Sequence, residues 1–131
     1  MKLFSPERAN ALILKLEPLL EELLNKRRDL AIKLLESDPA LHRSEPSRRP
    51  RLAGVRSPLP PPRFGELKHE IGKLIYRIES FGCVLKDIDL GLVDFPSMLA
   101  DEPVYLCWKL GEPEVAYWHG IDEGFSSRQP L

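Results

Sequence analysis

The sequence predicts an α+β fold: a long antiparallel helical hairpin, followed by a small antiparallel β-sheet of two β-hairpins and a C-terminal tail. Apolar residues recur every three or four positions over about 5–37 and again over about 63–81, the spacing of helices that bury one face. A basic, proline-rich loop over 38–62 separates these stretches. Over 82–121 the apolar period changes to the alternation of β-strands.

Length and composition indicate one domain over 1–131, with its tail over 122–131. Of the 131 residues, 43% are hydrophobic and 30% are charged, as in globular proteins. No apolar run approaches the roughly 20 residues that cross a bilayer, and the first residues lack the features of a secretory signal. The two cysteines form no Cys-x-x-Cys motif and fit a reducing compartment. We therefore expect a cytoplasmic protein without a membrane partner.

The first helix, about 5–37, has a clear start signal. Ser5 can cap free backbone N–H groups, Pro6 suits the first helical position, and Glu7 faces the positive end of the helix dipole. Pro18 lies inside the pattern and should kink the helix, because it donates no backbone hydrogen bond. The apolar positions have the spacing of a coiled-coil seam: Ala9, Leu12, Leu16, Leu19, Leu23, Leu30 and Leu34.

The second helix, about 63–81, ends at Gly82, a residue type common at helix C-termini. Because it is much shorter than the first helix, the first helix has an apolar seam at about 23–35 with no partner in the hairpin. Exposed apolar stripes of this kind favour association. We therefore expect a homodimer whose contact includes Leu23, Leu30 and Leu34; another, unidentified protein is the alternative partner.

The loop over 38–62 contains the cluster Arg48, Arg49 and Arg51. A solvated linker is the first interpretation. Contact of these arginines with RNA or an acidic partner is the alternative. The net charge of −1 argues against nucleic acid.

Two short strands over 83–87 and 92–95 predict the first β-hairpin. The turn Asp89-Leu90-Gly91 between them suits a three-residue loop with Gly91 in the left-handed conformation. Pro96 should end the second of these strands, and a loop is expected over 97–103.

The second β-hairpin is expected from Val104–Leu110 and Glu114–His119, joined by a two-residue loop at Gly111-Glu112. This register pairs Leu106 with Tyr117 and Val104 with His119. It places Tyr105 and Trp118 on one outer face, which we interpret as a second candidate for partner contact.

Three aspartates near the first hairpin are candidate metal ligands. Asp87 and Asp89 share one side of a strand or turn, and Asp94 can return opposite them. Close carboxylates bind Mg²⁺, Mn²⁺ or Ca²⁺, and His119 can complete such a site. The alternative is that Asp87 and Asp89 cap a turn, as short polar side chains do.

A second group of candidate metal ligands surrounds His119. His119 with Asp122 and Glu123 is a possible Zn²⁺ site that needs a recruit such as Asp89 or His69; a structural histidine is the alternative.

Cys107 and His119 lie on opposite faces in the expected register, which argues against a nucleophile–base pair. Arg128 can pair with Glu112 or Glu114 and fix the tail, or bind an anionic ligand.

The C-terminal half resembles a family of small bacterial proteins known only as a domain of unknown function (DUF 2203). The stretches that carry the resemblance include 86–89, 91–96, 104–108, 110–114, 118–119 and 128–131, with Gly124; in the N-terminal half they are Phe4, 9–12 and 19–20. The proline- and arginine-rich loop departs from the family. The resemblance implies the helical hairpin and sheet, and it implies no activity, cofactor or substrate.

The leading interpretation is a non-catalytic interaction protein that self-associates through its helices. The alternative is a metal-dependent, hydrolase-like enzyme that uses Asp87, Asp89, Asp94 and His119. No cofactor is predicted beyond the divalent ion that this alternative needs.

Overall fold

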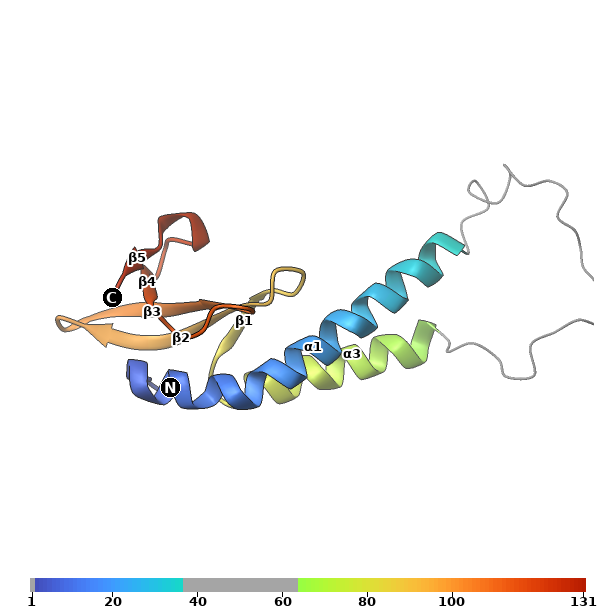
Figure 1. Ribbon diagram of the computed structural model, residues 1–131, viewed down its shortest axis with the longest axis horizontal. Helices are drawn as coiled ribbons and strands as arrows, with labels where there is room; N and C mark the ends of the chain where they lie inside the picture. Colours follow the sequence, from blue (N-terminus) through green and yellow to red (C-terminus); the bar gives the residue numbers. More distant parts are fainter. Residues whose placement is uncertain (1, 37–63) are drawn as a thin grey trace, which may run out of the picture.

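The computed structural model describes residues 2–36 and 64–131. Its two helices lie side by side in opposite directions, and the sheet packs at one end of this hairpin (Figure 1). The α+β class is therefore confirmed. In chain order the elements are α1 Pro6–Glu36, α3 Phe64–Glu79, β1 Val84–Asp87, β2 Leu92–Leu99, β3 Glu102–Lys109, β4 Tyr117–Gly120, the 3₁₀ helix η1 Phe125–Ser127 and β5 Gln129–Pro130.

The start of α1 follows the capping signal in the sequence. The Ser5 side-chain oxygen accepts a hydrogen bond from the backbone N–H of Arg8 at 3.2 Å and the Ser5 carbonyl accepts one from Ala9 at 2.9 Å, which satisfies donors at the first turn. Pro18 lies inside the helix, and the helix axis changes direction along its length (Figure 1). Neither described helix has the length and apolarity needed to cross a membrane.

The strands of the described chain form one antiparallel sheet in the order β1-β2-β3-β4-β5. The predicted first hairpin is present as β1 and β2, but the four residues 88–91 connect its strands instead of the expected three. Gly91 has a φ of +65°, and its N–H donates to the Ile88 carbonyl at 3.1 Å. The tail is part of the sheet, since β5 pairs with β4.

The expected end of β2 at Pro96 is wrong, because the strand continues to Leu99. The Pro96 carbonyl accepts a hydrogen bond of 2.7 Å from the N–H of Phe4 rather than from β3. The backbone N and C=O of one residue point to the same side of a strand, so the nitrogen of Pro96 also points away from β3. Pairing with β3 therefore needs no N–H from Pro96. Ala100 and Asp101, both with positive φ, form the tight turn into β3.

The predicted register of β3 and β4 is wrong by one residue. Leu106 pairs with Trp118 rather than Tyr117, and Val104 pairs with Gly120. The connection between the two strands, residues 110–116, is longer than two residues, and side chains help to hold it. The Glu112 carboxylate accepts the N–H of Lys109 at 2.8 Å. Asn10 of α1 accepts the N–H of Val115 at 2.6 Å, which ties the loop to the helix.

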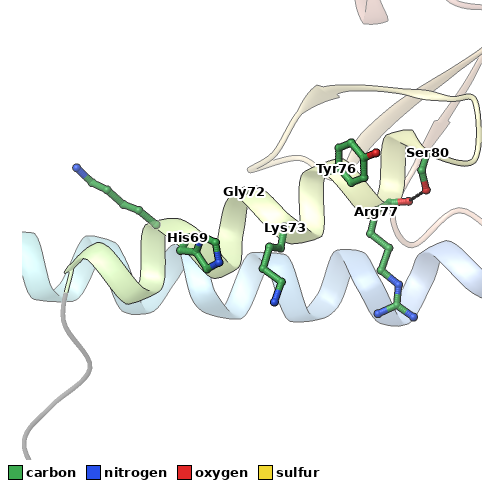
Figure 2. Close-up of a pocket in the computed structure, with 7 residues that line it drawn as sticks. His69, Gly72, Lys73, Tyr76, Arg77 and Ser80 are labelled. Carbon is green, nitrogen blue, oxygen red and sulfur yellow. Dashed lines mark hydrogen bonds between the residues drawn. The ribbon is translucent and has the colours of Figure 1, made fainter.

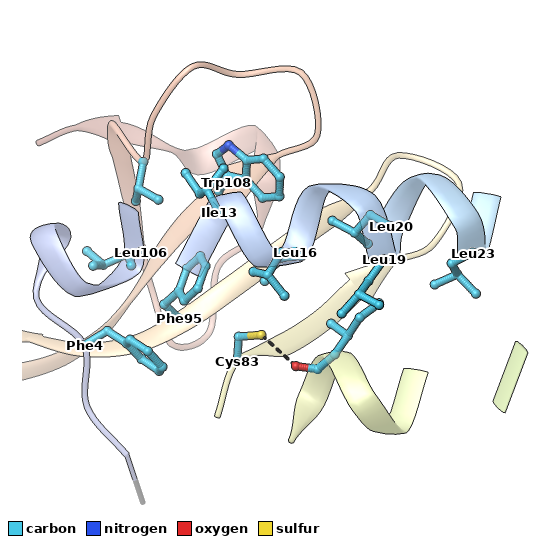
Figure 3. Close-up of a cluster of buried hydrophobic side chains, with 14 of the residues drawn as sticks. Phe4, Ile13, Leu16, Leu19, Leu20, Leu23, Cys83, Phe95, Leu106 and Trp108 are labelled. Carbon is cyan, nitrogen blue, oxygen red and sulfur yellow. Dashed lines mark hydrogen bonds between the residues drawn. The ribbon is translucent and has the colours of Figure 1, made fainter. Parts of the chain in front are cut away.

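The hydrophobic core lies between the helices and one face of the sheet (Figure 3). Trp108 and Phe95 are its largest fully buried side chains from the strands. Figure 3 also shows the buried Cys83 thiol, which donates to the Ile78 carbonyl at 3.3 Å. The seam of α1 supplies Ala9, Ile13, Leu16, Leu19, Leu20 and Leu23.

Candidate functional site

Three buried polar side chains meet on the face of the sheet opposite the core. Asp94 of β2 is paired in register with Cys107 of β3, and His119 of β4 is paired with Tyr105, two residues along β3. Because side chains alternate along a strand, this register places all three on one face. Each residue offers a ligand atom within 4.8 Å of the other two, and at most 1% of each residue is exposed.

The hydrogen bonds of His119 restrict the positions of its protons. Its Nδ1 lies 2.8 Å from the Gly120 carbonyl, which can only accept, so Nδ1 carries a proton. Its Nε2 lies 3.0 Å from Oδ2 of Asp94. One proton must lie between these two atoms, on either the imidazole or the carboxyl group. Asp94 and His119 therefore share a proton.

The second carboxyl oxygen of Asp94, Oδ1, is buried and has no hydrogen-bond partner. An unsatisfied buried polar atom costs roughly 1–3 kcal/mol of folding free energy. A buried oxygen in this state marks a place where a further ligand would be stabilising.

The Cys107 thiol is kept protonated. Burial, and then the nearby charge of Asp94, raise its pKa to about 12. The expectation that Cys107 and His119 lie on opposite faces is wrong, since the observed register puts them together. Even so, a buried thiol with a raised pKa lacks the thiolate that a nucleophile needs.

The predicted site of Asp87, Asp89, Asp94 and His119 is only half assembled. Asp87 accepts the N–H of Leu90 at 3.0 Å and caps the turn, the structural alternative considered above. Asp89 is exposed and pairs with Arg27 of α1 at 3.6 Å. Among the described residues, neither aspartate joins the cluster of possible metal ligands around His119.

The other residues proposed near His119 also have separate roles. Glu123 accepts the N–H of Gly120 at 2.8 Å, and Asp122 is exposed. His69 lies on α3 at the edge of an open hollow of about 620 Å³ (Figure 2). The residues that line this hollow come from α3 and the turn directly after it: Lys68, His69, Gly72, Lys73, Tyr76, Arg77 and Ser80. It is basic but shallow, since one helix cannot enclose a ligand.

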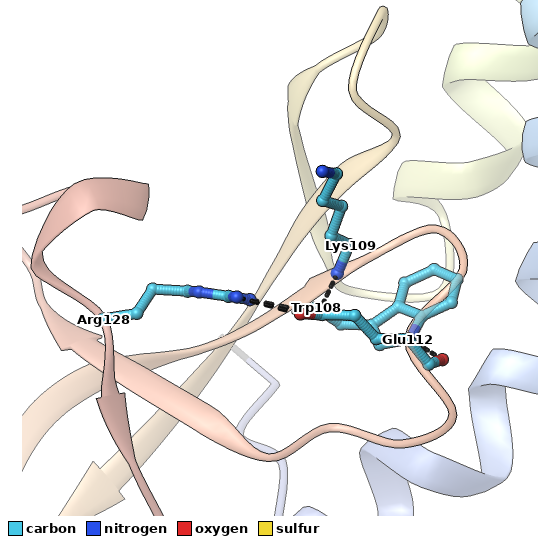
Figure 4. Close-up of polar contacts among 4 residues, drawn as sticks. All are labelled: Trp108, Lys109, Glu112 and Arg128. Carbon is cyan, nitrogen blue, oxygen red and sulfur yellow. Dashed lines mark hydrogen bonds and ion pairs between the residues drawn. The ribbon is translucent and has the colours of Figure 1, made fainter.

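Arg128 fixes the tail to the loop between β3 and β4 (Figure 4). Its guanidinium group donates two hydrogen bonds to the Glu112 carboxylate, at 3.0 and 2.8 Å. The same group lies 4.1 Å from the ring centre of Tyr117 and 4.3 Å from that of Phe125. Hydrogen bonding and ion pairing with Glu112 raise the pKa of Arg128. These contacts support the predicted structural role, in which Arg128 pairs with Glu112 and fixes the tail, over the binding of an anionic ligand.

A model of the family described as an uncharacterized conserved protein (DUF2203) matches residues 2–131. The chain belongs to this family. No curated protein and no solved structure gives a significant match. The DUF2203 description assigns no reaction, so function has to be argued from this chain's own geometry.

The structure separates the residues predicted for partner contact in this DUF2203 protein. Trp118 packs against the core, whereas Tyr105 lies beside His119 with ring centres 5.7 Å apart. Their placement on one outer face is therefore wrong, because of the shifted register. Leu23 is fully buried, and Leu30 is partly buried against the core. Leu34 is 53% exposed. Arg48, Arg49 and Arg51 lie outside the described residues.

Cys107 is the member of the buried cluster that sequence reasoning left out. The signal that points to it is Pro113, which cannot donate the closing bond of a two-residue turn. A longer loop shifts β4 by one residue and brings Cys107 and His119 to the same face.

Proposed function

We propose that the protein is a non-catalytic interaction protein that self-associates through the last turns of α1. The observation that carries the proposal is the exposure of large apolar side chains there. Ile32 is 45% exposed and Leu35 is 58% exposed. Leu23, earlier on the same helix, is fully buried. On the face of the helix that carries Leu23, Leu30 is only partly buried and Leu34 is 53% exposed, so apolar burial on this face decreases toward the end of the helix.

Helix length explains this gradient. α1 has 31 residues and α3 has 16, so α3 cannot accompany α1 along its whole length. Removing a large aliphatic side chain from water stabilises by about 1.5–3 kcal/mol when the whole side chain is covered. A patch of this size must offset an association cost of at least about 4 kcal/mol. We therefore expect weak association, with a Kd in the micromolar range or above.

A second copy of the chain suits this surface, because the surface carries both an acidic and a basic residue and can therefore pair with the same surface of another copy. An antiparallel two-fold arrangement of α1 can place Asp29 of each copy beside Lys33 of the other. Asp29, Ile32, Lys33 and Glu36 also line an open hollow of about 250 Å³. Their spacing is that of the hole that a side chain of a facing helix fills in coiled-coil packing.

Sedimentation equilibrium over a wide concentration range tests this proposal. The wild-type protein should show a monomer–dimer equilibrium, and Leu35→Glu should remain monomeric. Leu14→Glu is the matched control, because Leu14 is on the same helix and is 77% exposed. It should associate like the wild type. A wild-type protein that is monomeric at millimolar concentration contradicts the proposal, as does a Leu14→Glu variant that loses association equally.

The metal-dependent enzyme has less support. Of its four proposed residues, only Asp94 and His119 lie together, and both are almost fully buried. A hydrolytic site needs a ligand position that substrate can reach.

A further inference from the structure

The geometry points to a binding site for one zinc ion at Asp94, Cys107 and His119. This inference is independent of self-association, because the cluster lies in the sheet and α1 contributes no ligand to it. It also differs from the carboxylate sites that bind Mg²⁺ or Ca²⁺, because only one of its three ligands is a carboxylate and the other two are a thiol and an imidazole.

The donor set is the first argument. One sulfur, one imidazole nitrogen and one carboxylate oxygen are the ligand types that zinc takes in proteins. Hard cations such as Mg²⁺ and Ca²⁺ prefer oxygen ligands alone. Within the described chain no fourth ligand residue joins this group, which leaves one coordination position for water or another ligand.

The orientation of His119 is the second argument. Its Nδ1–H donates to the Gly120 carbonyl at 2.8 Å, so Nε2 is the atom that faces the cluster. Histidines that bind metals nearly always donate their other ring N–H to a carbonyl or carboxylate. The backbone of β4 thus provides the support that a ligating histidine needs.

The unsatisfied oxygen of Asp94 is the third argument. Oδ1 of Asp94 is buried without a hydrogen-bond partner, although Oδ2 bonds His119. A cation among the three side chains would stabilise the whole carboxylate, including this oxygen. The proton shared with His119 satisfies only one of its two oxygens.

The distances leave a small adjustment for binding. Bonds of about 2.0–2.3 Å in a tetrahedral site place two of these ligand atoms about 3.3–3.6 Å apart. The Nε2 to Oδ2 distance is 3.0 Å, and all three ligand atoms lie within 4.8 Å of one another. Shifts of up to about an ångström, which small side-chain rotations supply, convert the cluster into a coordination site.

Charge and protons balance on binding. The ion replaces the thiol proton of Cys107 and the proton shared by Asp94 and His119, and both protons pass to solvent. The positive charge of Arg128 lies near Cys107, but the carboxylate of Glu112 neutralises it at 2.8 Å. The positive charge of Arg128 is thus already balanced by Glu112 and repels an entering cation less.

Cobalt(II) is the probe, because it replaces zinc and its bond to a thiolate gives a charge-transfer absorption band. The full chain is titrated with Co²⁺, once in the native state and once during refolding from urea, since the site is closed. We expect one Co²⁺ per chain with a thiolate band, and displacement of Co²⁺ by Zn²⁺. The absence of the band under both conditions overturns the proposal, as does Co²⁺ binding without thiolate absorption.

Variants identify the ligands. Cys107→Ser should lose the thiolate band and weaken Zn²⁺ binding by more than the roughly 10–100-fold typical of losing a supporting residue alone. His119→Gln should weaken binding similarly. Cys83→Ser is the matched control, because Cys83 is also buried but bonds the Ile78 carbonyl; it should keep the band. Loss of the band in Cys83→Ser with retention in Cys107→Ser overturns the assignment, and the wild-type titration decides the case if a variant does not fold.

Discussion

Replacing Arg128 should destabilise the protein although only three residues follow it in the sequence. Arg128→Ala removes two hydrogen bonds to Glu112 and the contacts with the rings of Tyr117 and Phe125. Exposure of the ion-paired side chains is only 13% for Arg128 and 23% for Glu112. Water therefore screens this pair less than an ordinary surface ion pair.

The magnitude follows from these contacts. A charge-assisted bidentate pair of this exposure contributes about 1–2 kcal/mol, and each cation–ring contact about 0.5–1 kcal/mol. Glu112 keeps its bond to the Lys109 N–H, so it is not left without a partner. The sum predicts a loss of about 2–4 kcal/mol in the free energy of unfolding. Arg128→Lys keeps the charge but loses the planar fork, and should lose roughly half as much.

Urea denaturation followed by tryptophan fluorescence and circular dichroism measures this loss. Arg28→Ala is the control, because Arg28 is exposed and bonds only Asn25 in the described structure; its change should stay within about 0.5 kcal/mol. Hydrogen exchange adds a local readout, because the Leu131 N–H donates to the Ala116 carbonyl and should lose protection in Arg128→Ala. Unchanged stability together with unchanged protection of Leu131 would refute the reasoning.

Three further predictions concern glycines, cysteines and pH. Gly72→Ala should stabilise the folded protein by about 0.5–1 kcal/mol, because a Cβ at this position meets no other atom within 4 Å. Gly91→Ala should destabilise it, because Gly91 has a φ of +65° and the added Cβ would lie 2.7 Å from the Cβ of Leu110. Urea denaturation midpoints compare the stability of the two variants, and equal effects of the two substitutions would contradict this prediction. In metal-free protein, burial raises the pKa of Cys83 to about 11 and of Cys107 to about 12, so neither thiol should react with a disulfide reagent at pH 8 until urea is added; rapid native labelling would be contrary. Burial alone would raise the pKa of Glu112, but its arginine partner lowers it overall. The stability that the charged Glu112 adds to the folded protein is therefore present above the ordinary carboxyl pKa, and it is lost as pH falls through the lowered pKa of the folded protein. On acidification, Glu112→Gln should therefore lose less free energy of unfolding than the wild type.

Local signals in the sequence predict much of this fold. Ser5 and Pro6 locate the start of α1, and Gly91 locates the turn between β1 and β2. These residues act through their own backbone and immediate neighbours, so their effect can be read from a short window. The helical period of α3 is equally local, since each apolar position faces the same side of one helix.

The errors arose where distant residues decide the structure. Pro96 remains in β2 because Phe4, far away in sequence, supplies the hydrogen bond at that edge. Ala100 and Asp101 form a left-handed turn without the glycine that usually signals one. The register of β4 depends on Asn10 of α1, which holds Val115 in the preceding loop.

The candidate site shows the consequence of a register error. A shift of one residue reverses the face of every side chain on a strand. The sequence pattern indicates Asp94 and His119 as possible ligands, but the register it predicts puts Cys107 on the opposite face and puts Tyr105 and Trp118 together, and both placements differ from the structure. The alternation of a strand puts Asp87 and Asp89 on one side, but the turn binds Asp87 and Arg27 of α1 binds Asp89, so neither joins the cluster.

The cluster of Asp94, Cys107 and His119 exists only if β3 and β4 pair in the observed register. Cross-strand nuclear Overhauser effects between backbone protons in isotope-labelled protein measure this register directly. The observed register predicts contacts of Leu106 with Trp118 and of Tyr105 with His119. Contacts of Leu106 with Tyr117 and of Val104 with His119 would contradict it, and would separate Cys107 from His119.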